Sequence, residues 1–194
     1  MSLSDPIKVM IRVVEVLEKL RIPYYLGGSL ASSVYGTPRA TQDIDIVADI
    51  QFQHVKLFVN SFTEEEFYID EEMIKEAIAS KSSFNIIHLE AMIKVDIFIF
   101  NDTSFAQSEM SRRRRELIMS DPESFVSLPT PEDIILQKLL WFNMGGRVSD
   151  RQWQDILGVI NVQSNKLDLT YLNLWAKKLN LFELLQQALK DAKM

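Results

Sequence analysis

Two acidic residues that alternate along a predicted strand are the part of this sequence best suited to chemistry. They are Asp43 and Asp45, in the segment Asp43-Ile44-Asp45-Ile46. Because successive side chains of a strand point to opposite faces, both carboxylates are expected on the same face. Neighbouring carboxylates repel each other, and a divalent cation bound by both relieves that repulsion. The pair therefore predicts a metal site for Mg²⁺ or Mn²⁺.

A glycine turn precedes the two acids. Gly27 and Gly28, followed by Ser29, stand between a short predicted strand at 24–26 and a predicted helix at 30–35. A glycine has no side chain to keep a phosphate away from the backbone, and the N–H groups at a helix start bind anions. We expect Ser29 to be the N-cap of the helix and to hold the β- and γ-phosphates. The turn and the acids together predict a site for a metal-bound nucleoside triphosphate.

The composition limits the kinds of protein this chain can be. It has 194 residues, no cysteine and a formal net charge of −6. The absence of cysteine excludes disulfides, zinc-thiolate sites and thiol nucleophiles, and the negative charge disfavours a broadly basic nucleic-acid surface. The apolar runs are too short to cross a bilayer, and charged residues interrupt the apolar residues at the N-terminus. We therefore expect a cytoplasmic protein with no membrane partner.

Helix and strand patterns alternate in the first half, and helical patterns dominate the second. The expected helices are at 5–21, 30–35, 54–62, 71–79 and 170–192, with further helix starts at Thr130 and Ser149. The expected strands are at 24–26, 44–50, 67–69, 84–89, 93–100 and 125–128. This order predicts an α/β (α+β) fold: a small mixed sheet flanked by helices, followed by a helical C-terminal region.

A third, isolated acid completes a recognisable pattern. Asp96 lies in the later strand Lys94-Val95-Asp96-Ile97-Phe98. With it, the sequence resembles the DNA polymerase beta-like nucleotidyltransferase superfamily, and is similar to its small prokaryotic members of the AbiEii toxin type. The residues that carry this resemblance are Gly27-Gly28-Ser29, Arg39-x-Thr41-x-Asp43-Ile44-Asp45 and Asp96.

The resemblance covers residues 24–100 well and continues more weakly through 131–138 and 151–156. It implies a nucleotidyltransferase core at 1–105 and a mainly helical region at 106–194 packed on it as one compact unit. It also implies an enzyme that moves a nucleoside monophosphate from a nucleoside triphosphate to an acceptor hydroxyl and releases pyrophosphate. Such transfer uses two metal ions. Asp43 and Asp45 would bind both, and Asp96 would complete the ion that binds the acceptor hydroxyl.

Four further residues are candidates for the same site. Arg39 and Thr41, just before the strand that holds the acids, are candidate nucleotide-binding residues. Lys138 falls among apolar residues on its helix, so its charge must either snorkel or meet an anion such as a triphosphate. Asp155 lies opposite the buried stripe of its helix and faces a cleft or water. In AbiEii-type members a lysine and an aspartate at comparable places complete the active site, which assigns both residues to catalysis and Lys138 also to the nucleotide.

The sequence leaves the acceptor and the biological context open. The resemblance suggests tRNA, a protein or a small molecule such as an aminoglycoside as acceptor. The run from Arg112 to Arg115 either steers an RNA acceptor or is a solvated, partly salt-bridged segment. Two alternatives stand beside the enzyme: a toxin–antitoxin component with an antitoxin partner, and a non-catalytic nucleotide-binding interaction module. The three intact acids Asp43, Asp45 and Asp96 speak against the second.

Overall fold

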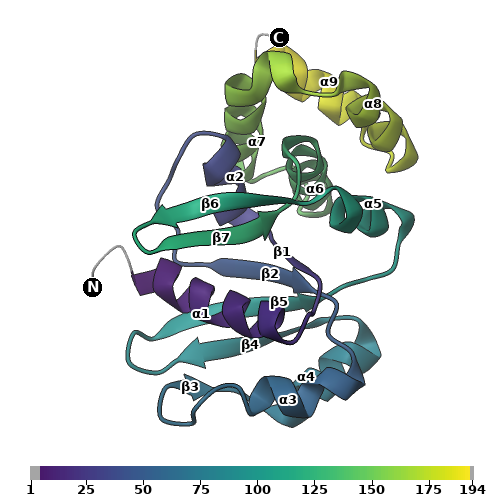
Figure 1. Cartoon of the computed structure of the whole chain (residues 1–194). Helices are drawn as coiled ribbons and strands as arrows, with labels where there is room; N and C mark the ends of the chain where they lie inside the picture. Colours follow the sequence, from purple (N-terminus) through teal and green to yellow (C-terminus); the bar gives the residue numbers. More distant parts are fainter. Residues whose placement is uncertain (1–4, 193–194) are drawn as a thin grey trace. The chain divides into compact units, whose positions relative to one another are not determined.

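The computed structural model describes residues 5–192, which divide into two compact units (Figure 1). The first unit runs to Gly27 and resumes at Thr41–Leu128, and the second consists of Gly28–Ala40 and the residues from Pro129 onward. The chain therefore leaves the first unit at the glycine pair and returns to it just before Asp43. The boundary that the sequence suggested near residue 105 lies inside the first unit.

A five-stranded mixed sheet is the centre of the first unit, as predicted. The strand order is β1-β2-β5-β4-β3, with β2 and β5 parallel and the other neighbours antiparallel. The strands are β1 (Tyr24–Leu26), β2 (Ile44–Ala48), β3 (Phe67–Tyr68), β4 (Ser83–His88) and β5 (Ile93–Ile99).

One face of this sheet is apolar and the other carries the polar side chains. Along β5 the side chains at 93, 95, 97 and 99 are buried, while those between them are more exposed. Helix α1 (Asp5–Lys19) contacts β5 and lies across the sheet in Figure 1. Its buried stripe includes Met10, Val13 and Leu17. Because the apolar face is covered, Asp96 is left on the opposite face.

The remaining elements of the first unit differ in part from expectation. They are η1 (Phe52–His54), α3 (Val55–Val59), α4 (Glu71–Ser80), α5 (Ser104–Arg112), β6 (Arg114–Ser120) and β7 (Glu123–Leu128). Strands β6 and β7 form a separate two-stranded sheet. The sequence did not predict β6, which interrupts the helical pattern expected after residue 106, whereas the strand expected at 125–128 is part of β7. Strand β6 lacks the alternation that marks a half-buried strand, since even Leu117 is 48% exposed, and its pairing with β7 defines it.

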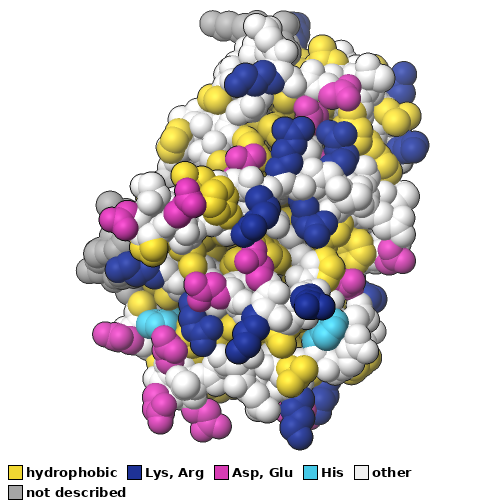
Figure 2. Space-filling view, viewed as in Figure 1, with side chains coloured by type: hydrophobic (Ala, Val, Ile, Leu, Met, Phe, Trp, Pro, Cys, Tyr) yellow, Lys and Arg dark blue, Asp and Glu magenta, His cyan; other side chains and the backbone are white. Residues whose placement is uncertain are grey.

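The arginine run lies where α5 ends and β6 begins. Arg114 and Arg115 are exposed, and the Arg115 guanidinium lies 5.6 Å from the centre of the Phe125 ring on β7. Figure 2 shows Lys and Arg side chains gathered over the part of the view that β6 occupies in Figure 1. Because α5 ends at Arg112, the run is not helical as a whole, and its role in steering RNA stays a prediction.

The second unit is helical throughout the described residues. It contains α2 (Gly28–Tyr35), α6 (Pro131–Met144), α7 (Asp150–Gln163), η2 (Ser164–Lys166), α8 (Leu169–Lys178) and α9 (Phe182–Asp191). Thr130 caps α6 and Ser149 caps α7, each accepting a backbone N–H from the third residue after it, as predicted. No helix within residues 5–192 is long and apolar enough to cross a bilayer.

Helix α2 begins two residues earlier than the sequence predicted. The helix begins at Gly28, so Ser29 lies inside its first turn and is not its N-cap. Gly28 has φ of +59°, in the left-handed region that a residue with a Cβ enters only at a cost. The turn therefore needs a glycine at position 28.

Helices α2 and α7 approach each other closely after the end of α2. A Cβ on Gly36 would lie 2.8 Å from the Val159 backbone nitrogen and 2.8 Å from the Ser32 carbonyl oxygen. Both are backbone atoms and have little freedom to move. The contact therefore depends on the missing side chain of Gly36.

We expect Gly36→Ala to lower the free energy of unfolding by about 1–3 kcal/mol, because overpacking forces the backbone apart. Urea denaturation followed by circular dichroism measures the change. Gly27→Ala is the matched control, since its Cβ would meet the Asp45 Cβ at an ordinary 4.0 Å. Equal stability of the two variants would contradict the close approach of α2 and α7.

Candidate functional site

The parallel pairing of β2 and β5 places two of the predicted acids side by side. Asp45 is the register partner of Asp96, and both side chains are half-buried. Register partners on neighbouring strands project from the same face. Gly27 follows β1 and donates its N–H to the Asp45 carbonyl oxygen at 2.8 Å, so it lies in the same row. Asp43 is exposed and directly precedes β2.

A lysine lies among the three acids. The Lys94 Nζ is 2.7 Å from the Asp96 Oδ2. The hydrogen bond to Asp96 raises the pKa of Lys94, and although burial opposes this, the charges of Asp96, Asp43 and Asp45 raise it further. The three carboxylates therefore produce one shared negative potential on this face of the sheet.

The donor set fits Mg²⁺, which prefers carboxylate oxygens. Two of the three acids are register partners, and all three attract the same ammonium group. Among residues 5–192, no group of three or more acidic or histidine side chains is arranged to hold a metal ion, and Asp96 is paired with Lys94. The assignment of Asp43, Asp45 and Asp96 as metal ligands therefore stays a prediction.

The structure adds one residue to this face that sequence reasoning missed. Asn85 on β4 is the register partner of Asp96, so the row runs from Gly27 through Asp45 and Asp96 to Asn85. The Asn85 side chain is half-buried. The short gap between the strands expected at 84–89 and 93–100 contained the necessary signal, because antiparallel pairing across that gap brings position 85 opposite position 96.

Four other predicted residues come together in the second unit. The Asp155 Oδ1 accepts a hydrogen bond from the Arg39 Nε at 2.9 Å, and its Oδ2 accepts from the Arg39 Nη2 at 3.1 Å and the Lys138 Nζ at 2.8 Å. The Arg39 Nη2 also donates to the Ser29 Oγ. Residues from α2, the segment after it, α6 and α7 thus form one polar network, which we call the Arg39–Asp155 network.

This network is largely withdrawn from water. The side chains of Lys138 and Asp155 are 5% and 6% exposed, and that of Arg39 is 29% exposed. Burial alone raises the pKa of the Asp155 carboxyl, but the hydrogen bonds and charges of Arg39 and Lys138 outweigh it, so this pKa lies below its ordinary value. Lys138 does not snorkel, and the anion that it meets is Asp155. Two cations thus contact the same carboxylate.

Thr41 has a local structural role. Its Oγ1 accepts the Asp43 backbone N–H at 3.2 Å, which orders the chain just before β2. The contact fixes the direction in which the chain enters β2. The nucleotide-binding role that the sequence suggested for Thr41 stays a prediction.

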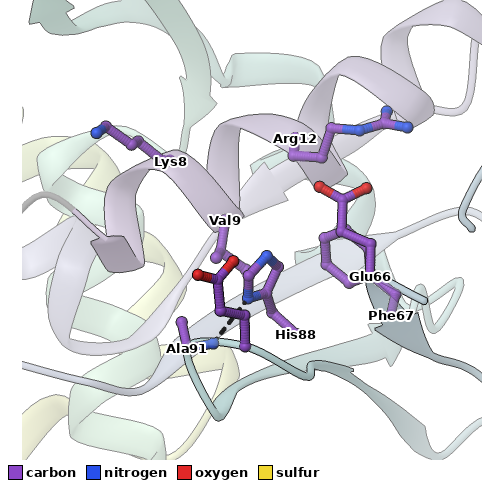
Figure 3. Close-up of a pocket in the computed structure, with 8 residues that line it drawn as sticks. Lys8, Val9, Arg12, Glu66, Phe67, His88 and Ala91 are labelled. Carbon is purple, nitrogen blue, oxygen red and sulfur yellow. Dashed lines mark hydrogen bonds between the residues drawn. The ribbon is translucent and has the colours of Figure 1, made fainter. Parts of the chain in front are cut away.

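A groove of about 360 Å³ lies elsewhere in the first unit, between α1, β3 and the turn from β4 to β5 (Figure 3). The His88 ring projects into it, with its Nδ1 accepting the Ala91 N–H at 3.1 Å and its edge against Phe67. None of the predicted site residues lines this groove. The groove opens on the apolar side of the sheet, which α1 covers. His88 and the buried Ile86 are two residues apart in β4, so their side chains project from the same face.

The lowered pKa of Asp155 makes stability depend on pH. The Asp155 carboxylate contributes fully above its ordinary pKa of 3.8, and this contribution is lost as pH falls through the lowered pKa of the folded protein. We expect Asp155→Asn to destabilise the protein by about 3 kcal/mol at neutral pH, because it removes the buried carboxylate that Arg39 and Lys138 both contact. The difference from wild type should shrink below the ordinary pKa. Urea denaturation at several pH values measures it.

Asp150→Asn is the matched control, because Asp150 is an exposed acid in the first turn of the same helix. The free energy of unfolding of this variant should be close to that of wild type at every pH. Two results would contradict the account of the network. One is an Asp155→Asn variant as stable as wild type at neutral pH, and the other is a loss of stability that stays the same in strong acid.

Comparisons with known proteins show the fold. No model of a protein family matches this sequence, and no curated protein matches it significantly. The lincosamide antibiotic adenylyltransferase LnuA, solved with lincomycin bound, is 16% identical with a TM-score of 0.53, and the alignment covers 80% of this chain and 96% of that chain. An antigenic nucleotidyltransferase-like protein from Paracoccidioides brasiliensis is 19% identical with a TM-score of 0.55, covering 96% and 93%.

JHP933 from Helicobacter pylori is 16% identical with a TM-score of 0.51, and the alignment covers 84% of this chain and 68% of that chain. At these identities the likeness concerns the fold, and the AbiEii-type placement stays a prediction. The mixed sheet flanked by helices that the sequence predicted is confirmed. The chain has the fold seen in these three structures.

Proposed function

We propose that this protein is a metal-dependent nucleotidyltransferase that moves a nucleoside monophosphate from a nucleoside triphosphate to an acceptor hydroxyl and releases pyrophosphate. The observation that carries the proposal is the parallel register of Asp45 and Asp96, with Asp43 beside them and Lys94 drawn to all three. Carboxylate oxygens set side by side are the ligands that Mg²⁺ prefers. The likeness of the fold to nucleotidyltransferase structures supports the same reaction class.

Asp43, Asp45 and Asp96 are the residues that would hold the metal. When bound, the ions neutralise phosphate oxygens and favour ionisation of the acceptor hydroxyl. In an in-line displacement the acceptor and the leaving pyrophosphate lie on opposite sides of the α-phosphorus. Gly27 adjoins Asp45 on the β1 side of the row, and Asp96 lies on the β4 side.

This order assigns different tasks to the two ends of the row. The glycine end suits the phosphates, because Gly27 presents no side chain there. The other end suits the acceptor, where Asp96 accepts the proton of the attacking hydroxyl as general base. Asn85, the next residue of the row, orients that hydroxyl through its side-chain amide.

The proposal keeps the nucleotide-binding roles that the sequence assigned to Ser29, Arg39 and Lys138. These residues lie together in the Arg39–Asp155 network, where Ser29 accepts a hydrogen bond from Arg39. Arg39 and Lys138 would contact the β- and γ-phosphates, with Arg39 held bidentate by Asp155. A carboxylate with a lowered pKa is a poor base, so we assign Asp155 to positioning the two cations.

The acceptor is a separate question from the reaction. The three acceptor classes that the sequence suggested are tRNA, a protein and a small molecule such as an aminoglycoside. LnuA was solved with a small antibiotic bound. A test for the acceptor of this chain should therefore include a small molecule. The location and any antitoxin partner also stay predictions.

We expect the double variant Asp45→Asn/Asp96→Asn to bind Mg²⁺–nucleoside triphosphate at least about tenfold more weakly than wild type, because both carboxylate charges at the metal are lost. Calorimetric titration with each of the four triphosphates measures the affinity. The control is Asp49→Asn, since Asp49 follows β2 and accepts a hydrogen bond from Gln51. Unchanged affinity in the double variant would contradict the proposed site.

Replacement of Arg39 separates the phosphate contacts from the metal contacts. We expect Arg39→Met to weaken binding of the Mg²⁺–triphosphate complex by about tenfold, through loss of a charge-assisted contact, while the affinity for Mn²⁺ alone stays at the wild-type value. Arg151→Met is the control, because Arg151 is an exposed arginine of the second unit. Equal affinities of the two variants for the triphosphate would show that Arg39 does not contact it.

A further inference from the structure

The face of the sheet that carries the acids also carries a cation of its own. Lys94 and Asp96 are two residues apart in β5, so both side chains project from the same face. The Lys94 Nζ lies 2.7 Å from the Asp96 Oδ2, with the two side chains 52% and 23% exposed. The lysine is therefore bound to one carboxylate, and about half of its side chain is open to water.

The influence of this lysine extends past Asp96. Ile44 and Val95 are register partners, so the residues that precede them, Asp43 and Lys94, enter the sheet at the same level. Asp96, which holds the ammonium group, is in turn the register partner of Asp45. The Lys94 ion pair therefore lies on the face of the sheet where the proposed function places the metal.

Without a cation, this arrangement of acids repels itself. Asp45 and Asp96 are neighbours on paired strands, where directly opposed like charges are destabilising. Lys94 supplies one positive charge at that point. A metal ion that takes an oxygen of Asp96 must compete with the same ammonium group for it.

We propose that Lys94 is the exchangeable counter-cation of the metal site: it neutralises the carboxylates before metal binds, and the metal must displace it from Asp96. This inference rests on the proposed function, because it assigns the same three acids to the metal. Lys94 then acts as a positioning residue that lowers the affinity for free metal. Metal that arrives with a triphosphate has the further contacts of the nucleotide to offset the displacement.

Titration with Mn²⁺ alone tests the exchange, with the free ion followed by electron paramagnetic resonance and no nucleotide present. We expect Lys94→Met to bind Mn²⁺ about fivefold more tightly than wild type, a size typical of a part-exposed ion pair. Lys94→Arg keeps the charge and should stay near the wild-type affinity. Added Mg²⁺ should also raise the melting temperature of Lys94→Met more than that of wild type.

Lys75→Met is the matched control. Lys75 pairs with Glu71 and Glu72 at 2.8 and 2.7 Å on helix α4, so its removal deletes a similar ion pair outside the sheet. It should leave Mn²⁺ affinity unchanged. Equal or weaker Mn²⁺ binding by Lys94→Met, in a protein whose wild type does bind Mn²⁺, overturns the exchange and leaves the proposed function standing. Absence of Mn²⁺ binding in wild type and Lys94→Met alike overturns the metal site itself.

Discussion

The parallel pairing of β2 with β5 is the constraint on which the proposed chemistry depends. Parallel strands need a crossover connection, and here the chain passes through α3, β3, α4 and β4 before it returns as β5. The register of that return sets Asp96 beside Asp45. A shift of one residue would turn Asp96 into the apolar core and place Val95 or Ile97 on the outer face. The buried side chains of β5 thus fix the position of the carboxylate as well as the stability of the sheet.

Each unit holds its own cluster of charged side chains. In the first, the Lys94 ammonium group binds Asp96, whose register partner is Asp45. In the second, Arg39 and Lys138 both contact the carboxylate of Asp155. The chain crosses from one unit to the other at Gly27-Gly28 and returns before Asp43.

Much of this organisation follows from the sequence. The glycine turn, the alternating acids and the later strand with Asp96 predicted the sheet, and the capping residues Thr130 and Ser149 predicted the starts of α6 and α7. The sequence did not predict the contacts between segments that are far apart in the chain. No local pattern shows that Asp155 binds Arg39 and Lys138, because three separate segments must fold together first. Strand β6 was missed because its side chains do not alternate between buried and exposed. Only its pairing with β7 shows that it is a strand. The start of α2 was placed two residues too late, since Gly28 takes the left-handed conformation at the helix start and Ser29 lies inside the first turn.

The central claim concerns which phosphorus is attacked, and a pair of labelled substrates tests it most directly. The protein is incubated with Mg²⁺ and a nucleoside triphosphate labelled at either the α- or the γ-phosphate, together with tRNA, an aminoglycoside or no added acceptor. The account predicts that α-label appears in an acceptor, or in the protein itself, while γ-label leaves as pyrophosphate. Transfer of γ-label to any acceptor would contradict it. So would the absence of α-label transfer to all of these acceptors by a protein that binds the Mg²⁺–triphosphate complex.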